Sequence, residues 1–245
     1  MAASVTPVVK GAQDSRWPRP ARLTALYDVY LRRGAQVEER DGWLLLRSYT
    51  DLATEQTVLR STVGLLDIGE SGKIDLKSKS LDGVLASSFA GAGHVDVGMS
   101  WADDGAPETR VCRLTDEQAL ILTPPAAFDA TLDLLRRAAA VHDCAHVTDL
   151  TGALCGVRLL GPHAPALLER LSSLDLAPDR FAHGALVQGP VARVHTLIVR
   201  RDRAGLTGYD LFVDRDLGIY FWETLVETGA PLDLMPVSRH AEEGL

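Results

Sequence analysis

The 245-residue sequence has only three cysteines, Cys112, Cys144 and Cys155, and the odd count leaves at least one thiol unpaired. No two of them form a Cys-x-x-Cys pair, so their spacing provides neither a redox motif nor half of a zinc site. This pattern excludes a disulfide-stabilised secreted domain and fits a reducing compartment. We expect the cysteines to serve as small core residues.

Long hydrophobic runs are also absent. No stretch approaches the roughly 18 consecutive apolar residues of a membrane-spanning helix. Residues 1–22 contain Pro7, Pro18 and Pro20 but no apolar centre typical of a secretory signal, and they are predicted to form an N-terminal tail. We therefore expect a cytoplasmic protein without a membrane partner.

Motifs for large anionic ligands and for metals are missing as well. The formal net charge is -8 and the arginines occur in short scattered groups, so no nucleic-acid partner is expected. The seven histidines show no His-x-His or His-Glu-x-x-His spacing, which leaves no predicted metal site. Neither a P-loop nor a Gly-x-Gly-x-x-Gly turn occurs, so the chain is not expected to bind a nucleotide or FAD by itself.

The most informative stretch that is present is Leu59–Leu76. An apolar run is followed by Gly69 and Gly72 and then by alternating apolar and polar residues, which predicts a buried strand, a turn and a half-buried strand. Polar groups at such a junction often face a pocket. These groups are Asp67, Glu70 and Ser71. The simpler alternative is a polar hairpin turn without a function.

The element pattern of the first half of the sequence recurs in the second half. The first half has Lys73–Leu76, Leu81–Phe89, Arg110–Leu114, Ala119–Thr123 and Ala126–Val141, and the second has Cys155–Leu160, Ala164–Leu171, Val194–Arg200, Tyr209–Val213 and Leu217–Gly229. The predicted fold is α+β, with β-α-β-β-α units at residues 23–145 and 146–245, each an antiparallel sheet backed by helices. A ligand cleft is expected between the two units.

Four further elements are predicted in the first half. Leu23–Arg33 has helical spacing and ends at Gly34, and Thr54–Ser61 is a second short helix. Val37–Tyr49 reads as a hairpin around the dipeptide Asp41-Gly42, while His94–Trp101 reads as extended chain.

Short motifs occur in the order found in one known family. They are Leu26-Tyr27-Asp28, Val63-Gly64-Leu65-Leu66-Asp67, Gly72-Lys73-Ile74, Val147-Thr148-Asp149-Leu150-Thr151 and Leu160-Gly161-Pro162-His163-Ala164. The ordered set resembles the glycine-cleavage T-protein (aminomethyltransferase) superfamily, whose folate-binding module also occurs in sarcosine and dimethylglycine oxidising enzymes. The resemblance covers most of the chain and implies a T-protein-like module with a cleft for tetrahydrofolate.

The resemblance also implies site residues, and the sequence departs from the family pattern at several of them. The family's Asp-Asp motif, which places a carboxylate near the reacting folate nitrogen, corresponds to Pro107-Glu108, and its Ser-His-Met turn corresponds to Gly69-Glu70-Ser71. The family's Thr-Gly-Glu motif falls near Ala204-Gly205-Leu206 or Thr207-Gly208, where no Glu stands. The resemblance implies tetrahydrofolate as the cofactor. Without a Glu at this position the pterin ring would lose hydrogen bonds to a carboxylate, each worth roughly 1.5 to 3 kcal/mol.

The candidate catalytic residues are Glu108 and Glu70, as a general acid and base. The candidate substrate- and cofactor-binding residues are Asp67, Ser71, Arg200, Tyr209 and Arg239. The alternative for the two glutamates is a pair of solvated turn carboxylates, and for Arg200 a solvated arginine in a basic run.

Three functions are consistent with these residues. The first is an aminomethyltransferase-like enzyme that moves a methyl or aminomethyl group from a small amine or methylated substrate to tetrahydrofolate. The second is a non-catalytic subunit resembling the γ chain of heterotetrameric sarcosine oxidase, and the third is a folate-independent biosynthetic enzyme built on the same fold. The sequence ends at Glu242-Glu243-Gly244-Leu245, where the family's C-terminal barrel would begin. The resemblance therefore implies one of two alternatives: an oxidase or demethylase partner chain supplies the barrel's contribution, or the chemistry differs from that of the family.

Overall fold

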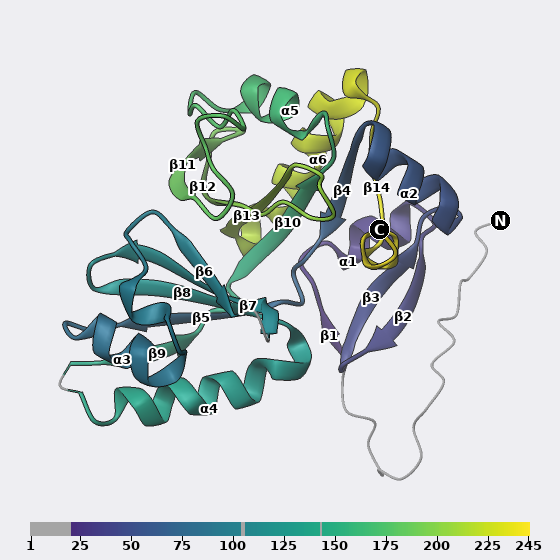
Figure 1. Ribbon diagram of the computed structural model, residues 1–245. Coiled ribbons are helices and arrows are strands. Elements are labelled where there is room, and N and C mark those ends of the chain that lie inside the picture. The colour runs from purple at the N-terminus through teal and green to yellow at the C-terminus, as the bar shows by residue number, and fades with distance from the viewer. Residues whose placement is uncertain (1–20, 104–105, 143) are drawn as a thin grey trace, which may run out of the picture.

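The computed structural model describes residues 21–103, 106–142 and 144–245. Its strands form three sheets, and helices lie against them (Figure 1). The architecture is α+β, as the sequence predicts.

The elements are as follows. The strands are β1 (Arg22–Leu23), β2 (Gln36–Arg40), β3 (Trp43–Ser48), β4 (Val63–Asp67), β5 (Gly72–Lys77), β6 (Ser100–Asp103), β7 (Ala106–Thr115), β8 (Gln118–Thr123), β9 (His146–Asp149), β10 (Leu154–Leu160), β11 (Leu186–Val191), β12 (Val194–Arg200), β13 (Gly208–Asp214) and β14 (Leu234–Pro236). The α-helices are α1 (Tyr27–Arg32), α2 (Leu52–Ser61), α3 (Leu81–Ser88), α4 (Phe128–Ala139), α5 (Ala164–Leu171), α6 (Gly218–Gly229) and α7 (Arg239–Glu243).

The internal repeat is visible in the strand orders of the two larger sheets. The five-stranded sheet has the order β6-β7-β8-β5-β9, and the six-stranded sheet has the order β11-β12-β13-β10-β4-β14. β6, β7, β8 and β5 therefore correspond to β11, β12, β13 and β10. The strand that precedes each of these four-strand groups joins the sheet of the other group. β4, from the first half, pairs antiparallel with β10, and β9, from the second half, pairs antiparallel with β5. The two halves of the chain are thereby interlocked.

The two larger sheets pack face to face, with helices on their outer faces (Figure 1). Period-two alternation produces this arrangement. In β8, Ile121 packs outward with α3 and α4, whereas Leu120 and Leu122 join a cluster with Leu197 and Phe212 of the six-stranded sheet. Apolar residues from both halves thus fill part of the space between the sheets.

The stretch around Gly69 forms the predicted strand, turn and strand, but it is not the hairpin of the simpler alternative. β4 and β5 lie in different sheets, so the turn between them carries the chain from one sheet to the other. Gly69 and Gly72 are not in the left-handed region; they are needed for close approach. A Cβ on Gly69 would lie 2.8 Å from Asp67 Oδ1, and one on Gly72 would lie 2.4 Å from the Phe128 ring.

Two other local predictions need correction. The helix predicted from Leu23 begins only at Tyr27, because Arg22 and Leu23 pair with β3 as strand β1. Within His94–Trp101, His94 ends a 3-10 helix (Ala92–His94) and only Ser100 and Trp101 belong to a strand. The hairpin around Asp41-Gly42 is confirmed as β2 and β3.

Helix α7 is held beside the β2–β3 hairpin by a buried carboxylate from α2. Glu55 Oε2 accepts hydrogen bonds from the backbone N–H and hydroxyl of Ser238, and its Oε1 accepts from the N–H groups of Tyr49 and Thr50. Ser238 in turn caps α7 by accepting from the N–H of Ala241. The position of α7 is therefore fixed by residues far away in the sequence.

Candidate functional site

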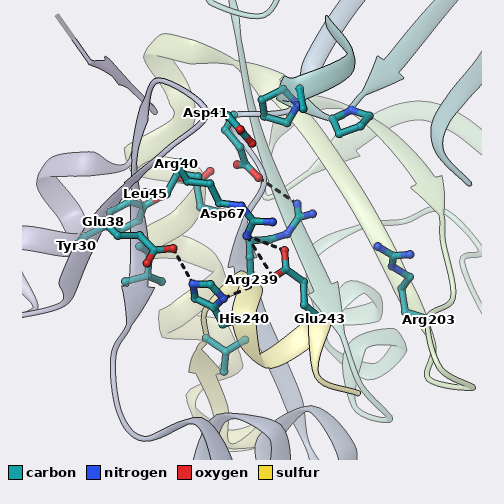
Figure 2. A pocket seen from close by; sticks show the side chains of 16 residues that line it. Tyr30, Glu38, Arg40, Asp41, Leu45, Asp67, Arg203, Arg239, His240 and Glu243 are labelled. Carbon is teal, nitrogen blue, oxygen red and sulfur yellow. Dashed lines mark hydrogen bonds and ion pairs between the residues drawn. The ribbon is translucent and has the colours of Figure 1, made fainter. Parts of the chain in front are cut away.

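A cavity of about 290 Å³ lies where the β2–β3 hairpin, the β4–β5 turn and α7 meet (Figure 2). Its apolar wall includes Tyr30, Leu45, Leu46, Pro124, Pro125, Ala126 and Val237. Its polar lining includes Glu38, Arg40, Asp41, Asp67, Glu70, Arg203, Arg239, His240 and Glu243. We call this cavity the hairpin pocket. It combines an apolar wall with convergent charged groups, as small-molecule sites do.

Asp67, the last residue of β4, presents a buried carboxyl group to the hairpin pocket. Its Oδ1 accepts a 2.7 Å hydrogen bond from the Gly69 N–H, whereas its Oδ2 is buried without a hydrogen-bond partner among the described residues. Burial, reinforced by the negative charge of Glu70, raises the pKa of Asp67 to about 7, although Thr24, Gly69 and Lys73 act in the opposite direction. A carboxyl group with such a pKa is partly protonated at neutral pH.

Glu70 lies in the same turn and is held by α7. Its Oε1 is 3.2 Å from Arg239 Nη1, and the Glu70 residue is only 5% exposed. The turn is braced from within by Lys73, whose Nζ donates to the carbonyls of Gly69 at 2.9 Å and Ser71 at 2.7 Å. Burial lowers the pKa of Lys73 to about 8. Asp67 and Glu70 are therefore presented by a rigid turn.

Half-exposed ion pairs line the mouth of the hairpin pocket (Figure 2). His240 Nε2 is 2.7 Å from Glu38 Oε1, and Arg40 Nη1 is 2.8 Å from Glu243 Oε1. Both pairs join the β2–β3 hairpin to α7. Exposed pairs of this kind contribute little stability, so the mouth is the weakly held side of the pocket.

Behind Arg239 lies a buried ionic cluster in the space between the two large sheets. Arg158 pairs with Asp210 and with Glu242, and Glu242 Oε1 is 2.9 Å from Arg203 Nε. A second cavity beside it, lined by Ser71, Arg158, Arg201, Asp210 and Arg239 among others, has a volume of only about 30 Å³. The polar interior between the sheets is thus filled by the chain's own charges.

Of the predicted site residues, Asp67, Glu70 and Arg239 come together in the hairpin pocket, and Ser71 lines the adjoining small cavity with Arg239. Arg200 and Tyr209 lie apart from the pocket, stacked on each other at 5.2 Å. Arg200 bonds Asp202 and the Phe181 carbonyl, and the buried Tyr209 hydroxyl donates to the Leu176 carbonyl. Glu108 falls in β7, and its side chain lies outside the described residues.

The sequence analysis missed most of the charged residues around the pocket. Arg158 and Asp210 are each an isolated charge between apolar residues of a strand. Their partners could have been sought from the sequence, because a charge in a buried strand is almost always paired. Glu38, Arg40, His240 and Glu243 carried no such signal, since they lie in polar segments that are ordinary for a surface.

The chain matches the GCVT N-terminal domain family over residues 26–245, and it belongs to that family. It is similar to the aminomethyltransferase of Streptomyces avermitilis, with 31% identity over 91% of this chain and 62% of the relative, and to that of Desulforamulus reducens, with 25% identity over 91% and 63%. The chain therefore spans about three-fifths of the length of these curated relatives.

Two solved structures share the fold. Glycine cleavage system aminomethyltransferase T from Bartonella henselae matches with a TM-score of 0.77 and 18% identity, covering 91% of this chain and 61% of that one. A chain of heterotetrameric sarcosine oxidase from Corynebacterium sp. U-96 matches with a TM-score of 0.59 and 18% identity, covering 76% and 95%. Both likenesses support the T-protein-like module.

Within the part of the chain that is described, no helix is long and apolar enough to cross a membrane.

Aminomethyltransferases as a family depend on tetrahydrofolate, so the fit of that cofactor can be tested against the pocket. About 290 Å³ is at the lower edge of the roughly 300 to 1,000 Å³ usual for ligand pockets. Tyr30 and Val237 give the pocket an apolar surface that suits the flat ring at one end of such a molecule. The residues present fit that ring.

Proposed function

We propose that the chain takes part in one-carbon transfer of the aminomethyltransferase type, in the cytoplasm. A small amine or methylated substrate would occupy the hairpin pocket and give its methyl or aminomethyl group to tetrahydrofolate. The gathering of Asp67, Glu70 and Arg239 in one pocket, in a chain of this family, carries the proposal.

The chain's own contribution would be to position the substrate and to exchange a proton with its nitrogen. Glu70, buried and held by Arg239, is the candidate for the proton exchange, and Glu108 for orienting the reacting centre. Tetrahydrofolate supplies the accepting nitrogen when it is bound.

Calorimetric titration with tetrahydrofolate tests the proposal. We expect a measurable heat and a thermal shift, and the absence of both at saturating tetrahydrofolate would overturn it. A panel of methyl-¹³C-labelled amines, followed by NMR for label on the folate, then tests transfer. Label transfer should fall at least about 100-fold in Glu70→Gln and in Glu108→Gln, and remain unchanged in the exposed control Glu39→Gln.

A second candidate function is a γ-like subunit of a sarcosine-oxidase-type complex. It is favoured by coverage, because the chain matches 95% of the sarcosine oxidase chain but only 61% of the T-protein. Co-expression with any flavin-dependent oxidase chains encoded beside its gene tests this function. Co-elution as one stable complex supports it, and separate elution contradicts it.

A further inference from the structure

The charged groups that line the hairpin pocket are almost all neutralised by one another. Arg40 pairs with Glu243, Glu38 with His240, and Arg239 with Glu70. Arg203, the remaining arginine of the lining, pairs with Glu242. The pocket therefore holds little unsatisfied positive charge for an anion.

Asp67 is the exception among the buried groups. The Asp67 residue is 6% exposed, and Oδ2 has no hydrogen-bond partner among the described residues although it is buried. A buried acceptor without a donor destabilises the protein, because it has lost its hydrogen bonds to water without a replacement. Lys73, whose charge acts on Asp67, directs its Nζ to the Gly69 and Ser71 carbonyls instead. Asp67 Oδ2 is therefore an acceptor to which no donor of the described residues is bonded.

The wall of the pocket indicates what else the ligand carries. Part of the wall is formed by apolar side chains, which have no hydrogen-bond donors: Leu45, Leu46, Pro124 and Pro125. Binding is favoured when methyl groups leave water and pack against such a surface. A cation with N–H donors and small alkyl groups satisfies both features.

We propose that Asp67 is the anchor of a site for a small protonated secondary or tertiary amine, with an ammonium N–H donating to Oδ2 and the N-methyl groups against the apolar wall. The assignment deepens the proposed function, on which it rests, by naming the residue that recognises the substrate nitrogen. Arg239 and Lys73 then act as positioning residues, because they fix the turn that carries Asp67 and Glu70.

Three charged or titratable groups face Asp67: Glu70 in the turn, Lys73 on β5 and Cys155 on β10. Near pH 6 the Lys73 ammonium is charged, and burial keeps the Cys155 thiol neutral by raising its pKa to about 12. An ammonium that binds at about pH 6 would therefore ionise Asp67 and release close to one proton.

Dimethylammonium chloride is the first probe, titrated at constant ionic strength and followed by thermal shift and calorimetry. We expect saturable binding to the wild type and at least about tenfold weaker binding to Asp67→Asn, which keeps the shape and removes the charge. Glu39→Gln removes one charge from an exposed position outside the pocket and should bind as the wild type does. Tetramethylammonium, which has no N–H to donate, should bind at least tenfold more weakly than dimethylammonium.

Proton release is the second measurement. At about pH 6, the heat of dimethylammonium binding should differ between buffers of different ionisation enthalpy for the wild type and not for Asp67→Asn. Equal binding by wild type and Asp67→Asn, or no binding by the wild type, would overturn the site. Because tetrahydrofolate is titrated separately, folate binding without amine binding rejects this site alone, and amine binding without folate binding rejects only the proposed function.

Discussion

Arg158 and Asp210 lie directly opposite each other on β10 and β13, with Arg158 Nη2 2.8 Å from Asp210 Oδ2 in a fully buried setting. The same guanidinium reaches Glu242 on α7. One arginine of the six-stranded sheet thus ties the C-terminal helix to the centre of the molecule.

Replacing Arg158 with Met should destabilise the protein by about 3 to 5 kcal/mol, because Asp210 and Glu242 would stay buried after each had lost one of its arginine partners. Urea unfolding measures the loss. The control is Arg180→Met, since Arg180 is 72% exposed and 4.0 Å from its partner Asp179, and it should shift the unfolding free energy by less than about 0.5 kcal/mol. A loss below about 1 kcal/mol in Arg158→Met would mean that the cluster adds no net stability.

The Glu242 carboxylate should stabilise the fold only above acidic pH. Burial alone would raise its pKa, but Arg158, Arg239 and Arg203 outweigh burial and hold the pKa at about 2, against 4.5 ordinarily. A lowered folded-state pKa gives stability that is present above about pH 4.5 and is lost as the pH falls towards 2, on the order of 3 kcal/mol. The unfolding free energies of Glu242→Gln and the wild type should therefore converge near pH 2, and a gap that stays constant with pH would contradict this.

Asp67 should have the opposite effect on stability. Its folded-state pKa of about 7 lies above the ordinary 3.8, so its contribution declines as the pH rises from about 4 to about 7. Above pH 7 the free energy of unfolding of Asp67→Asn should exceed that of the wild type by up to about 4 kcal/mol, and the difference should vanish below about pH 4. Thermal melts across this range test it, with Glu39→Gln as the control, and a destabilised Asp67→Asn at pH 8 would refute it.

Gly72 should be intolerant of a side chain for reasons of space. Its Cβ would lie 2.4 Å from the Phe128 ring and 2.7 Å from Thr123, so Gly72→Ala should cost about 1 to 3 kcal/mol of stability. Gly152→Ala is the matched control, because nothing lies within 4 Å of the added carbon. Adding Phe128→Leu to Gly72→Ala should recover part of the loss, and no recovery would place the strain elsewhere.

The sequence by itself determined the class of fold and the order of its elements. Hydrophobic periodicity is a local property, so the repeat of strand, helix, strand, strand and helix was readable, as was the hairpin at Asp41-Gly42. It also placed Asp67 and Glu70 together at the end of a strand, because they are neighbours in the chain.

Only the tertiary structure decided which distant residues complete the site. The exchange of β4 and β9 between sheets depends on pairing energies that no local pattern encodes, and it makes the turn at Gly69 a crossover between sheets and not a hairpin. The same is true of α7, which Glu55 and Arg158 dock against the hairpin from far away in the sequence. That docking brings Arg239 to Glu70, because long-range packing, and not local propensity, sets which charges meet.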